Sequence, residues 1–582
     1  MERTHNNGEL RLSDVNKEVT LLGWVAKRRN LGSLVFIDLR DRYGITQVIC
    51  DESLDEITSK IRNEYVLQVK GKVVQRQNPN PSLKTGEIEV EASEITIINT
   101  AETTPLIIAN ETDALEDTRM KYRYLDLRRP IMQEKLVIRH KITQTIREFL
   151  NNRDFIEVET PILTSTTPEG ARDYLVPSRV NPGKFYALPQ SPQLFKQLLM
   201  ISGLERYYQI ARCFRDEDLR SDRQPDFTQV DIEMSFMEEH EIMDLVEKMF
   251  AKVLKDVKDF EIKLPLRQIK YKDALGKYGS DKPDTRFGFE LVALNDVFVN
   301  TEYRIFKDIL GQNGYIKGIN AKGLSDNISR KDIDKYTELV KKYHAKGLSW
   351  ARVKEDTLEG PLAKNLTKEE INGLIKRFES NNGDILFIVS DINFEITCLS
   401  LGALRSELGK RFTPPKKDTF DLLWIVDFPL FEFDEDTQTI MAAHHPFTRP
   451  FKEDEHLLDT EPLKVRSHHY DLVLNGYELG SGSLRIYDQE MQRKVFKIIG
   501  LSDEDIEKRF GFFVNAFKYG TPPHGGLALG LDRIAMILTN SDSIRDVIAF
   551  PKNASAIDPM SEAPSEVSLK QLEELHLKIV KD

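Results

Sequence analysis

Cysteine is scarce in this chain. Its 582 residues include only Cys50, Cys213 and Cys398, which lie far apart. An odd and scattered set excludes a disulfide framework and a zinc site built from cysteines, and it suits a reducing cytosol. Long apolar runs are missing too: none approaches the ~20 residues that cross a bilayer, and the polar N-terminal residues contain no apolar signal core. We therefore expect a cytoplasmic protein without a membrane segment.

The familiar phosphate-binding and hydrolytic motifs are also missing. No G-x-x-x-x-G-K-[ST] loop occurs, and GSGSLR at 480–485 lacks the third glycine of a dinucleotide-binding fingerprint. The chain has neither H-E-x-x-H nor a G-x-S-x-G elbow. If this protein binds a nucleotide, arginines and metal-bound carboxylates must hold its phosphates.

Length and charge describe a soluble, multidomain protein. A chain of 582 residues exceeds what one hydrophobic core supports, so we expect about three or four domains. A hydrophobic fraction of 40% and a charged fraction of 30% are typical of globular proteins. The net charge of −12 argues against a surface coated in positive charge for nucleic acid, but it leaves room for local basic patches.

Residues 1–105 alternate short β-rich runs with turns, such as EVTLLGWVAKRR, SLVFIDLRD and YVLQVKGKVVQR. Five such runs with one helical stretch predict a small Greek-key barrel of the OB type. Basic residues gather in the KRR string that includes Arg28 and Arg29, and Phe36 and Gln47 lie on neighbouring predicted strands. An exposed aromatic ring can stack on an unpaired base while a glutamine amide contacts its edge. The alternative is that Phe36 is an ordinary core residue.

A connector at 106–130 leads into a first candidate catalytic segment at 131–284. The run EKLVIRHKITQTIREFLNN carries apolar residues near a 3.6-residue period and predicts an amphipathic helix. The alternating run FIEVETPIL predicts a strand at 155–163 at a sheet edge, because Pro161 cannot donate a hydrogen bond. Helix and strand suit either a dimer surface or packing within the chain.

The segment 285–410 differs from its surroundings in its sequence pattern. Lysine-rich helical stretches such as SRKDIDKYTELVKKYHAKG alternate with strand-like pieces such as GDILFIVS. We expect an autonomous α+β insert here, because the motifs that carry chemistry lie before it and after it. The segment 411–582, with DLLWIVDFPLF and GGLALGLDRIAMIL, returns to the earlier pattern and completes the catalytic domain with a C-terminal extension.

One charged stretch, CFRDEDLRSDRQPDFTQVDIE at 213–233, ends in an apolar run. On its own it suits a solvated hairpin tip, where most charged runs occur. Three pieces together resemble motifs 1, 2 and 3 of the class II aminoacyl-tRNA synthetases: the helix–strand unit ending at Pro161, FRDED…RQPDFTQVDIE, and GLALGLDRIAM with Arg533. The strings TPEGARDYLVPSR, QSPQLFKQLLM, AAHHPFT and NGYELGSGSLR resemble the bacterial-type aspartyl-tRNA synthetases.

The resemblance covers nearly the whole chain and implies a fold and a reaction. The implied fold is α+β and multidomain: an N-terminal OB-fold barrel for the anticodon, an antiparallel sheet flanked by helices, and an insert of the GAD type. The implied reaction activates L-aspartate with ATP to aspartyl-adenylate, releases pyrophosphate, and transfers aspartate to the 3′ end of tRNA-Asp. The motif 1 helix and strand imply a homodimer.

The resemblance also implies an ATP site. Arg215 would lie between the attacking carboxylate and the α-phosphate and stabilise the growing charge, with Arg533 at the γ-phosphate. Glu217, two residues further along the strand, would share its face and accept from the adenine amino group. Asp471 and Glu478 would coordinate Mg2+; without the resemblance they are ordinary surface carboxylates. The other implied ATP contacts are Asp216, Gln224, Gly530, Leu531 and Asp532.

An aspartate pocket needs cations for two carboxylates and anions for one ammonium. By resemblance, Lys196 and Arg485 clamp the side-chain carboxylate. Asparagine would be disfavoured, because its amide would leave these buried charges unpaired. Glu169, Gln193 and Asp231 would face the ammonium, with Glu169 on a loop that closes over the substrate. The other implied aspartate contacts are Arg215, His444 and His445. For the first of these histidines, a buried structural role is the alternative.

For tRNA, the resemblance implies that the barrel binds the anticodon loop, whose bases are unstacked. Phe36 would stack on a base, while Gln47 and Glu89 would contact base edges. Arg28 and Arg29 would supply local positive charge, so binding should depend steeply on salt.

Alternatives remain open. An asparaginyl- or lysyl-type synthetase shares the scaffold, but Lys196 with Arg485 favours an anionic substrate side chain. A paralogue that binds RNA without aminoacylating is the other alternative, and the presence of Arg215 and Arg533 argues against it. Leu31 favours an enzyme restricted to tRNA-Asp, and charging of tRNA-Asn stays open.

Overall fold

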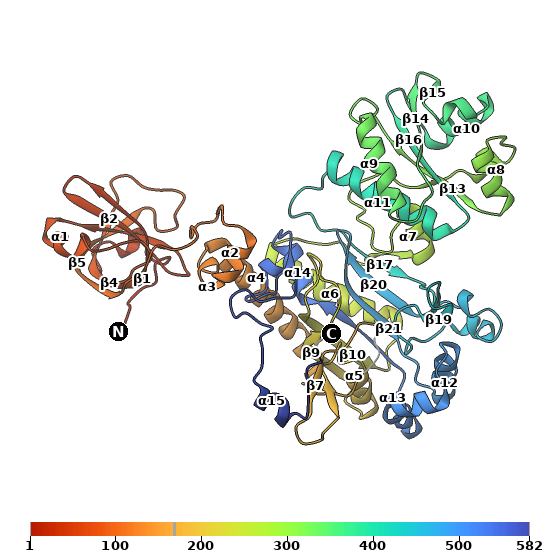
Figure 1. Cartoon of the computed structure of the whole chain (residues 1–582). Coiled ribbons are helices and arrows are strands. Elements are labelled where there is room, and N and C mark those ends of the chain that lie inside the picture. The colour runs from red at the N-terminus through yellow and green to blue at the C-terminus, as the bar shows by residue number, and fades with distance from the viewer. Residues whose placement is uncertain (1, 167–169, 581–582) are drawn as a thin grey trace. The chain divides into compact units, whose positions relative to one another are not determined.

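The computed structural model describes residues 2–166 and 170–580, and Figure 1 labels its elements. Contacts divide the chain into two compact units. The first comprises Met1–His140, Asp218–Pro225 and Ser541–Gln571, and the second comprises Lys141–Glu217, Asp226–Asn540 and Leu572–Asp582. Within the described part of the chain, no helix is both long and apolar enough to cross a membrane.

The first unit begins with a closed five-stranded barrel in the order β1-β2-β3-β5-β4. On its second strand, Val35, Ile37 and Leu39 are buried in the barrel core, while the alternate residues Phe36 and Asp38 are only half-buried. This alternation lets one face of each strand fill the core and the other meet solvent. The strands are β1 (Glu18–Leu31), β2 (Leu34–Arg40), β3 (Ile45–Cys50), β4 (Val66–Gln75) and β5 (Ile88–Asn99), with helix α1 (Asp55–Thr58) between β3 and β4.

Short helices follow the barrel in the same unit. Arg128 joins the two parts, because its Nη1 contacts Glu64 Oε2 at 3.0 Å and its guanidinium lies 5.3 Å from the centre of the Trp24 ring. The helices are α2 (Glu116–Lys121), α3 (Arg123–Asp126) and the first turns of α4 (Pro130–Asn151). The later segments of the unit contain the 3-10 turn η8 (Ile544–Asp546) and helix α15 (Leu569–Glu574).

The second unit is built on an eight-stranded sheet in the order β11-β17-β20-β21-β22-β10-β9-β6. Its neighbouring strands are antiparallel except at the two edges, where β11 pairs with β17 and β6 with β9 in parallel. The strands are β6 (Ile156–Glu157), β9 (Arg206–Phe214), β10 (Asp226–Ser235), β11 (Arg267–Lys270), β17 (Leu422–Val426), β20 (His469–Leu474), β21 (Tyr477–Leu484) and β22 (His524–Gly530).

Helices cover this sheet and bring distant motifs together. Helices α5, α6 and α14 contact the central strands β10 and β22. These two strands are neighbours in register, with Asp231 opposite Ala528 and Glu233 opposite Gly526, so two segments that are far apart in the sequence form the middle of the sheet. The helices of this part are α5 (Gln193–Ile201), α6 (Glu239–Lys258), α7 (Tyr271–Tyr278), α12 (Gln489–Ile498), α13 (Asp503–Ala516) and α14 (Leu531–Leu538).

The edge strand expected at 155–163 is much shorter than predicted. The expected helix forms as α4, but β6 contains only Ile156 and Glu157. One further ladder bond joins Val158 N to Tyr208 O at 3.1 Å, after which the chain leaves the sheet shortly before Pro161. A proline has no N–H to continue a ladder. The apolar side chains of Ile156, Ile162 and Leu163 are each 50% exposed at this edge.

The inserted segment forms a second sheet in the order β12-β13-β16-β14-β15 with helices on both faces (Figure 1). One core packs α9 and α11 against the sheet, and another packs α8 and α10. Its elements are β12 (Val292–Ala293), α8 (Arg304–Gly311), β13 (Tyr315–Ala321), α9 (Arg330–Lys341), β14 (Ser349–Lys354), β15 (Thr357–Glu359), α10 (Lys368–Phe378), β16 (Ile385–Asp391) and α11 (Phe394–Phe412). The contact division keeps these elements in the second unit, so the domain bounds 285–410 stay a prediction.

Helix α11 lies very close to the segment that follows α7. A Cβ on Gly402 would stand 1.9 Å from the backbone oxygen of Gly279, which itself has a φ of +65°. Only glycine permits this approach and this conformation together. Arg405 of the same helix donates from Nη2 to the backbone oxygens of Asp284, at 2.9 Å, and Phe287, at 2.7 Å. The helix therefore holds the loop after α7 through its backbone.

Candidate active site

Four charged side chains form a buried cluster at the centre of the sheet. Lys196, on α5, places its Nζ 2.7 Å from Asp231 Oδ1 and 3.3 Å from Glu233 Oε2, both on β10. Arg485, directly after β21, contacts Glu233 through Nε–Oε1 at 2.9 Å and Nη2–Oε2 at 3.2 Å. None of the four side chains is more than 1% exposed. Two cations and two carboxylates, whose formal charges balance, are therefore held out of water.

The two carboxylates of this cluster differ in proton affinity. Burial raises the pKa of Asp231 to about 6, even though the Lys196 cation opposes the rise. Burial also acts to raise the pKa of Glu233, but the charges of Arg485 and Lys196 outweigh it and hold the pKa below its ordinary value. Glu233 therefore stays ionised near neutral pH, while Asp231 titrates close to pH 6 in the absence of a further cation.

Two polar atoms at this cluster lack hydrogen-bond partners among the described residues. They are Asp231 Oδ2 and Gln193 Nε2, which lies one helical turn before Lys196 on α5. Both atoms are buried. Buried polar groups in folded proteins almost always have a partner, so an acceptor on β10 and a donor on the contacting helix α5 that both lack one indicate a polar ligand.

His445 completes the contacts of Arg485. The Nη1 of Arg485 donates to His445 Nε2 at 2.7 Å and to Ser483 Oγ at 2.8 Å. His445 Nδ1 lies 3.3 Å from both the backbone N–H of Phe447, from which it accepts, and the Thr448 hydroxyl. Burial and the positive charge of Arg485 lower the pKa of His445 well below its ordinary value. His445 is thus a neutral group that orients the guanidinium.

His444 stacks on His469 of β20, with ring centres 3.5 Å apart and planes 5° from parallel. His469 Nε2 lies 2.9 Å from Asp471 Oδ1 and 3.0 Å from Ser481 Oγ. Burial lowers the pKa of both histidines to about 3 and raises the pKa of Asp471 to about 6. The stack is neutral at physiological pH, so two buried rings face each other without repulsion.

A second acidic region lies at the hairpin of β20 and β21. Burial raises the pKa of Glu478, and the neighbouring charges of Asp471 and Asp281 raise it further. Lys282 Nζ, in the loop held by α11, lies 3.9 Å from Glu478 Oε2. Within the described residues, no three His, Cys, Asp or Glu side chains form a metal-binding group by themselves. These carboxylates suit a Mg2+ whose other ligands are phosphate and water oxygens.

Arg533 and Asp532 lie in the first turn of helix α14 but bond to different neighbours. Arg533 Nη1 donates to the backbone oxygen of Glu478. Asp532 is buried and its Oδ2 accepts from Thr228 N at 2.8 Å, so its carboxylate supports β10. Gly530 ends β22, and the buried Leu531 is the first residue of the helix.

The positions around Arg215 correct one prediction. Strand β9 ends at Phe214, so Arg215 and Glu217 are not on a strand and do not share a strand face, contrary to the prediction. The ladder stops because the partner strand β10 begins only at Asp226, opposite Phe214. Arg215 lies with its guanidinium 5.1 Å from the centre of the Phe227 ring, and its buried Nε has no partner among the described residues.

Two other predicted ATP contacts, Asp216 and Gln224, form hydrogen bonds with backbone atoms of other residues. Asp216 N donates to Arg172 O at 3.1 Å. Gln224 belongs to the first unit, where its amide makes two bonds with the backbone of Lys552: Nε2 to O at 2.9 Å, and Oε1 from N at 2.8 Å. Gln224 is only 2% exposed. The predicted contact at Glu169 lies outside the described residues.

The barrel carries a separate polar cluster on one outer face. Strand register places Phe36, Asp38 and Gln47 on this face, and Arg29 opposite Phe36. Gln47 Nε2 donates to Glu89 Oε2 at 2.6 Å, and Gln47 Oε1 accepts from Arg29 at 3.1 Å and Arg76 at 2.8 Å. The half-buried Phe36 therefore lies beside a network of paired donors and acceptors.

Arg28 is the exception among the predicted barrel residues. It lies opposite the inward-facing Ile37, and its Nε donates to Thr58 O at 2.9 Å. The structure therefore does not bring Arg28 to the face of Phe36. Arg76 is the second cation on that face, and sequence reasoning missed it because it directly follows the distant strand β4.

Other residues at the sheet site were also missed. Glu233 lies two residues after Asp231 on one strand, so the alternation in VDIEMSF would have placed both on one face. His524 contacts Gln197 Oε1 through Nε2 at 3.1 Å beneath the cluster. Asp281 and Lys282 had no sequence signal beyond their charge.

Comparisons with known proteins agree with this geometry. Residues 115–554 match the family of tRNA synthetases class II (D, K and N), and residues 19–98 match the OB-fold nucleic acid binding domain. The chain is 55% identical over 581 residues to the aspartate–tRNA(Asp/Asn) ligase of Geobacillus sp. (strain WCH70), covering 99% of this chain and 98% of that protein. A ligase of the same name from Bacillus thuringiensis (strain Al Hakam) is 55% identical, with 99% of each chain covered.

Solved structures share the fold at low identity. A putative aspartyl-tRNA synthetase from Leishmania major superposes with a TM-score of 0.59 at 19% identity, covering 95% of this chain and 94% of that one. An asparaginyl-tRNA synthetase from Pyrococcus horikoshii superposes with a TM-score of 0.57 at 19% identity, covering 93% and 96%.

Proposed function

The chain belongs to the class II tRNA synthetases (D, K and N) and is an aspartate–tRNA ligase, and we propose how its residues perform the reaction. Family membership confirms the predicted fold class, with an OB-fold domain and a helix-flanked antiparallel sheet. The ligase activates L-aspartate with ATP to aspartyl-adenylate, releases pyrophosphate, and transfers the aspartyl group to the 3′ end of tRNA-Asp.

The observation that carries the aspartate site is the orphaned acceptor Asp231 Oδ2 beside two buried cations. Asp231 receives the substrate ammonium on this oxygen, and Lys196 and Arg485 receive the side-chain carboxylate. The orphaned atom of Gln193 is a donor, so we assign Gln193 to a carboxylate oxygen of aspartate and not to the ammonium. Asparagine binds weakly, because its neutral amide leaves Lys196 and Arg485 uncompensated.

His444 and His445 lie behind the aspartate. Both are neutral, and His445 fixes the direction of Arg485 through the bond to Nη1. His444 presents a neutral ring from the stack with His469. These contacts favour a positioning role for His445. For His444, a structural role in the stack with His469 is compatible with a place at the wall of the pocket.

Activation joins two anions, and Arg215 overcomes their repulsion. An oxygen of the aspartate α-carboxylate attacks the α-phosphorus of ATP, while the bond from that phosphorus to the pyrophosphate oxygen breaks. The guanidinium of Arg215 stabilises the charge that grows on the α-phosphoryl oxygens. Its unpartnered Nε leaves donor capacity for this contact. Arg533 holds the γ-phosphate, and Glu217 contacts adenine; the further ATP contacts are Asp216, Gln224 and the backbone of 530–532.

Asp471 and Glu478 are the residues that would hold Mg2+ in this site. Burial is the main cause that raises the pKa of both carboxylates, and at Glu478 the charges of Lys282 and Arg533 oppose the rise. Two carboxylates in such surroundings suit a divalent cation. When bound, Mg2+ neutralises the phosphates of ATP.

The outer face of the barrel binds the anticodon loop of tRNA-Asp. Phe36 stacks on a base, and Gln47 and Glu89 present a donor–acceptor pair to base edges, while Arg29 and Arg76 supply charge. We also place the enzyme in the cytoplasm. The exposed apolar side chains beside β6 support a homodimer through α4 and this edge.

A second candidate specificity is the charging of tRNA-Asn. The two relatives at 55% identity are named for both tRNAs, whereas Leu31, 64% exposed at the end of β1, favours restriction to tRNA-Asp. Charging purified tRNA-Asp and tRNA-Asn side by side decides between them.

Aspartate-dependent exchange between ATP and labelled pyrophosphate tests the central reaction. We expect exchange with aspartate that collapses in Arg215→Ala. Equal exchange with asparagine or lysine in place of aspartate would contradict the proposal.

A further inference from the structure

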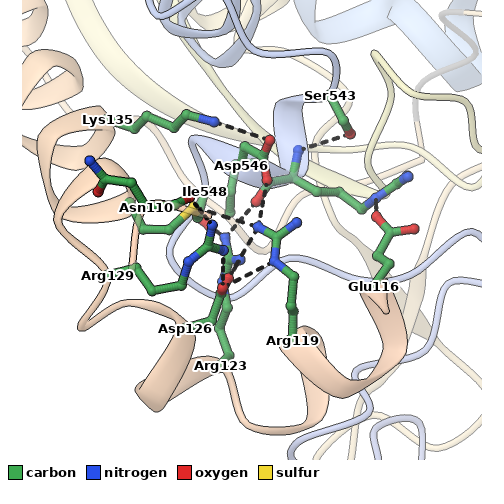
Figure 2. Close-up of polar contacts among 12 residues, drawn as sticks. Asn110, Glu116, Arg119, Arg123, Asp126, Arg129, Lys135, Ser543, Asp546 and Ile548 are labelled. Atoms are coloured by element: carbon green, nitrogen blue, oxygen red, sulfur yellow. Dashed lines mark hydrogen bonds and ion pairs between the residues drawn. The ribbon is translucent and has the colours of Figure 1, made fainter. Parts of the chain in front are cut away.

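A cluster of arginines surrounds one carboxylate in the first unit (Figure 2). Asp126, which has no exposed surface, accepts from Arg119 Nε at 3.0 Å and Nη2 at 3.2 Å, from Arg123 Nη1 at 2.6 Å and from Arg129 Nη1 at 2.7 Å. Three guanidinium groups thus share a single acceptor. Positive charge exceeds negative charge here, so the remaining donors must bind elsewhere.

Those donors bind the C-terminal segment of the same unit. Arg119 Nη2 contacts Asp546 Oδ1 at 3.0 Å, and Lys135 Nζ contacts Asp546 Oδ2 at 3.1 Å. Arg123 also donates to three backbone oxygens, those of Arg545 at 2.6 Å, Ile548 at 2.8 Å and Ala549 at 2.9 Å. Contacts to three backbone oxygens within five residues fix the path of the segment as well as pairing its charge.

The opposite side of this segment holds the loop that joins β9 to β10. Ser221 O accepts from Ile544 N at 3.0 Å and from Ser543 Oγ at 3.0 Å. Gln224 is bound at both amide atoms by the backbone of Lys552. The segment 543–552 therefore lies between the arginine cluster and the loop, and it touches each through hydrogen bonds.

We infer that Asp126, with its arginines, is a positioning residue for ATP binding: it fixes the segment 543–552, and this segment fixes the loop 218–225. The inference rests on the proposed function, which gives this loop contacts to ATP. Buried ion clusters add little stability over apolar packing but favour one geometry. The loop that follows Arg215 needs such a support, because six of its eight residues are polar or charged.

The test uses Asp546→Asn and Asp126→Asn in the full-length enzyme. Pyrophosphate exchange is measured with ATP varied at saturating aspartate and then with aspartate varied at saturating ATP. We expect the KM for ATP to rise about tenfold or more while the KM for aspartate stays within about twofold, because only the ATP loop shifts. Asp546→Glu, which keeps the charge, is expected to restore most of the affinity for ATP. Lys70→Ala, which removes an exposed barrel ion pair, is the control.

Hydrogen exchange gives a readout that does not depend on activity. Amides at 218–225 and 543–552 should lose protection in both asparagine variants but not in Lys70→Ala. Unchanged protection and an unchanged KM for ATP would overturn the inference, as would an equal rise of both KM values. If Asp126→Asn fails to fold, Asp546→Asn still decides, because the Asp546 side chain is 23% exposed and tolerates an amide. Absent exchange in the unaltered enzyme would instead count against the proposed function.

Discussion

Arg485 and Glu233 face each other through two parallel hydrogen bonds, of 2.9 Å and 3.2 Å, with neither side chain more than 1% exposed. This fork-to-fork contact fixes the plane of the guanidinium. Nη1 is left to contact His445 and Ser483. Arg485, which we propose binds the side-chain carboxylate of aspartate, is thus held in place by Glu233.

Glu233→Gln is expected to raise the KM for aspartate at least about thirtyfold, because Arg485 loses its buried counter-charge and its fixed plane. The measurement is pyrophosphate exchange with aspartate varied. Glu239→Gln is the matched control, because Glu239 is a partly exposed partner of His468 at 2.7 Å on α6. An unaltered KM in Glu233→Gln would show that Arg485 does not depend on this pair.

Aspartate binding is expected to weaken as pH falls below about 6. The substrate ammonium needs the ionised form of Asp231, whose pKa in the ligand-free protein is raised by burial to about 6. The dissociation constant should therefore rise about tenfold for each pH unit below that value. Calorimetry between pH 5 and pH 7.5 measures it. Asp231→Asn should bind weakly with no inflection near pH 6, and a persisting inflection would assign the titration to another group.

Asp231 also makes the stability of the ligand-free protein depend on pH in the opposite sense to most carboxylates. Its folded pKa lies above the unfolded value near ~3.9, so the folded state takes up a proton between about pH 4 and pH 6 that the unfolded state does not. The contribution of Asp231 to the free energy of unfolding therefore decreases as pH rises through this interval and is constant above it. Comparing urea unfolding of the protein and of Asp231→Asn across these pH values isolates the contribution.

Arg215→Lys is expected to lose about a thousandfold or more in the rate of pyrophosphate exchange. A lysine keeps the charge but not the planar, bidentate donor set that the α-phosphoryl group requires. Arg212→Lys, three residues earlier on β9, is the control, since the Arg212 side chain is 42% exposed and pairs with Asp226. Comparable losses in both variants would point to a general effect on the strand pair.

Phe36→Ala and Arg76→Ala are each expected to weaken tRNA-Asp binding by about five- to a hundredfold, through lost stacking and lost charge. Pyrophosphate exchange without tRNA should be unchanged, because the barrel is not part of the sheet site. Filter binding at two salt concentrations measures the effect. Only Arg76→Ala should reduce the salt dependence, and a tRNA affinity unaffected by both changes would place the anticodon elsewhere.

The sequence was sufficient to predict those residues of the sheet site that belong to short recognisable motifs. Lys196, Asp231, Arg485 and His445 do lie together. Glu233 was missed although its strand periodicity contained the signal. In the barrel, the sequence predicted that Phe36 and Gln47 lie on neighbouring strands, and the strand register places both on one outer face.

Other features depend on partners that no local pattern reveals. The amide of Gln224 binds a backbone 328 residues further along the chain. Arg76 reaches Gln47 only because the barrel closes. The strand expected at 155–163 stops at Glu157, because alternation of side chains does not guarantee backbone partners beyond the edge.

The contact between Gly279 and Gly402 limits how modular this enzyme is. The insert is continuous in sequence, so it could be deleted as a single segment. Helix α11, however, supplies the backbone against which Gly279 packs and the Arg405 bonds that hold the following loop. That loop carries Lys282 to within 3.9 Å of Glu478. A version shortened by excising 285–410 would therefore lose one wall of its acidic region, so a minimal enzyme must keep α11 or replace it with another close-packed helix.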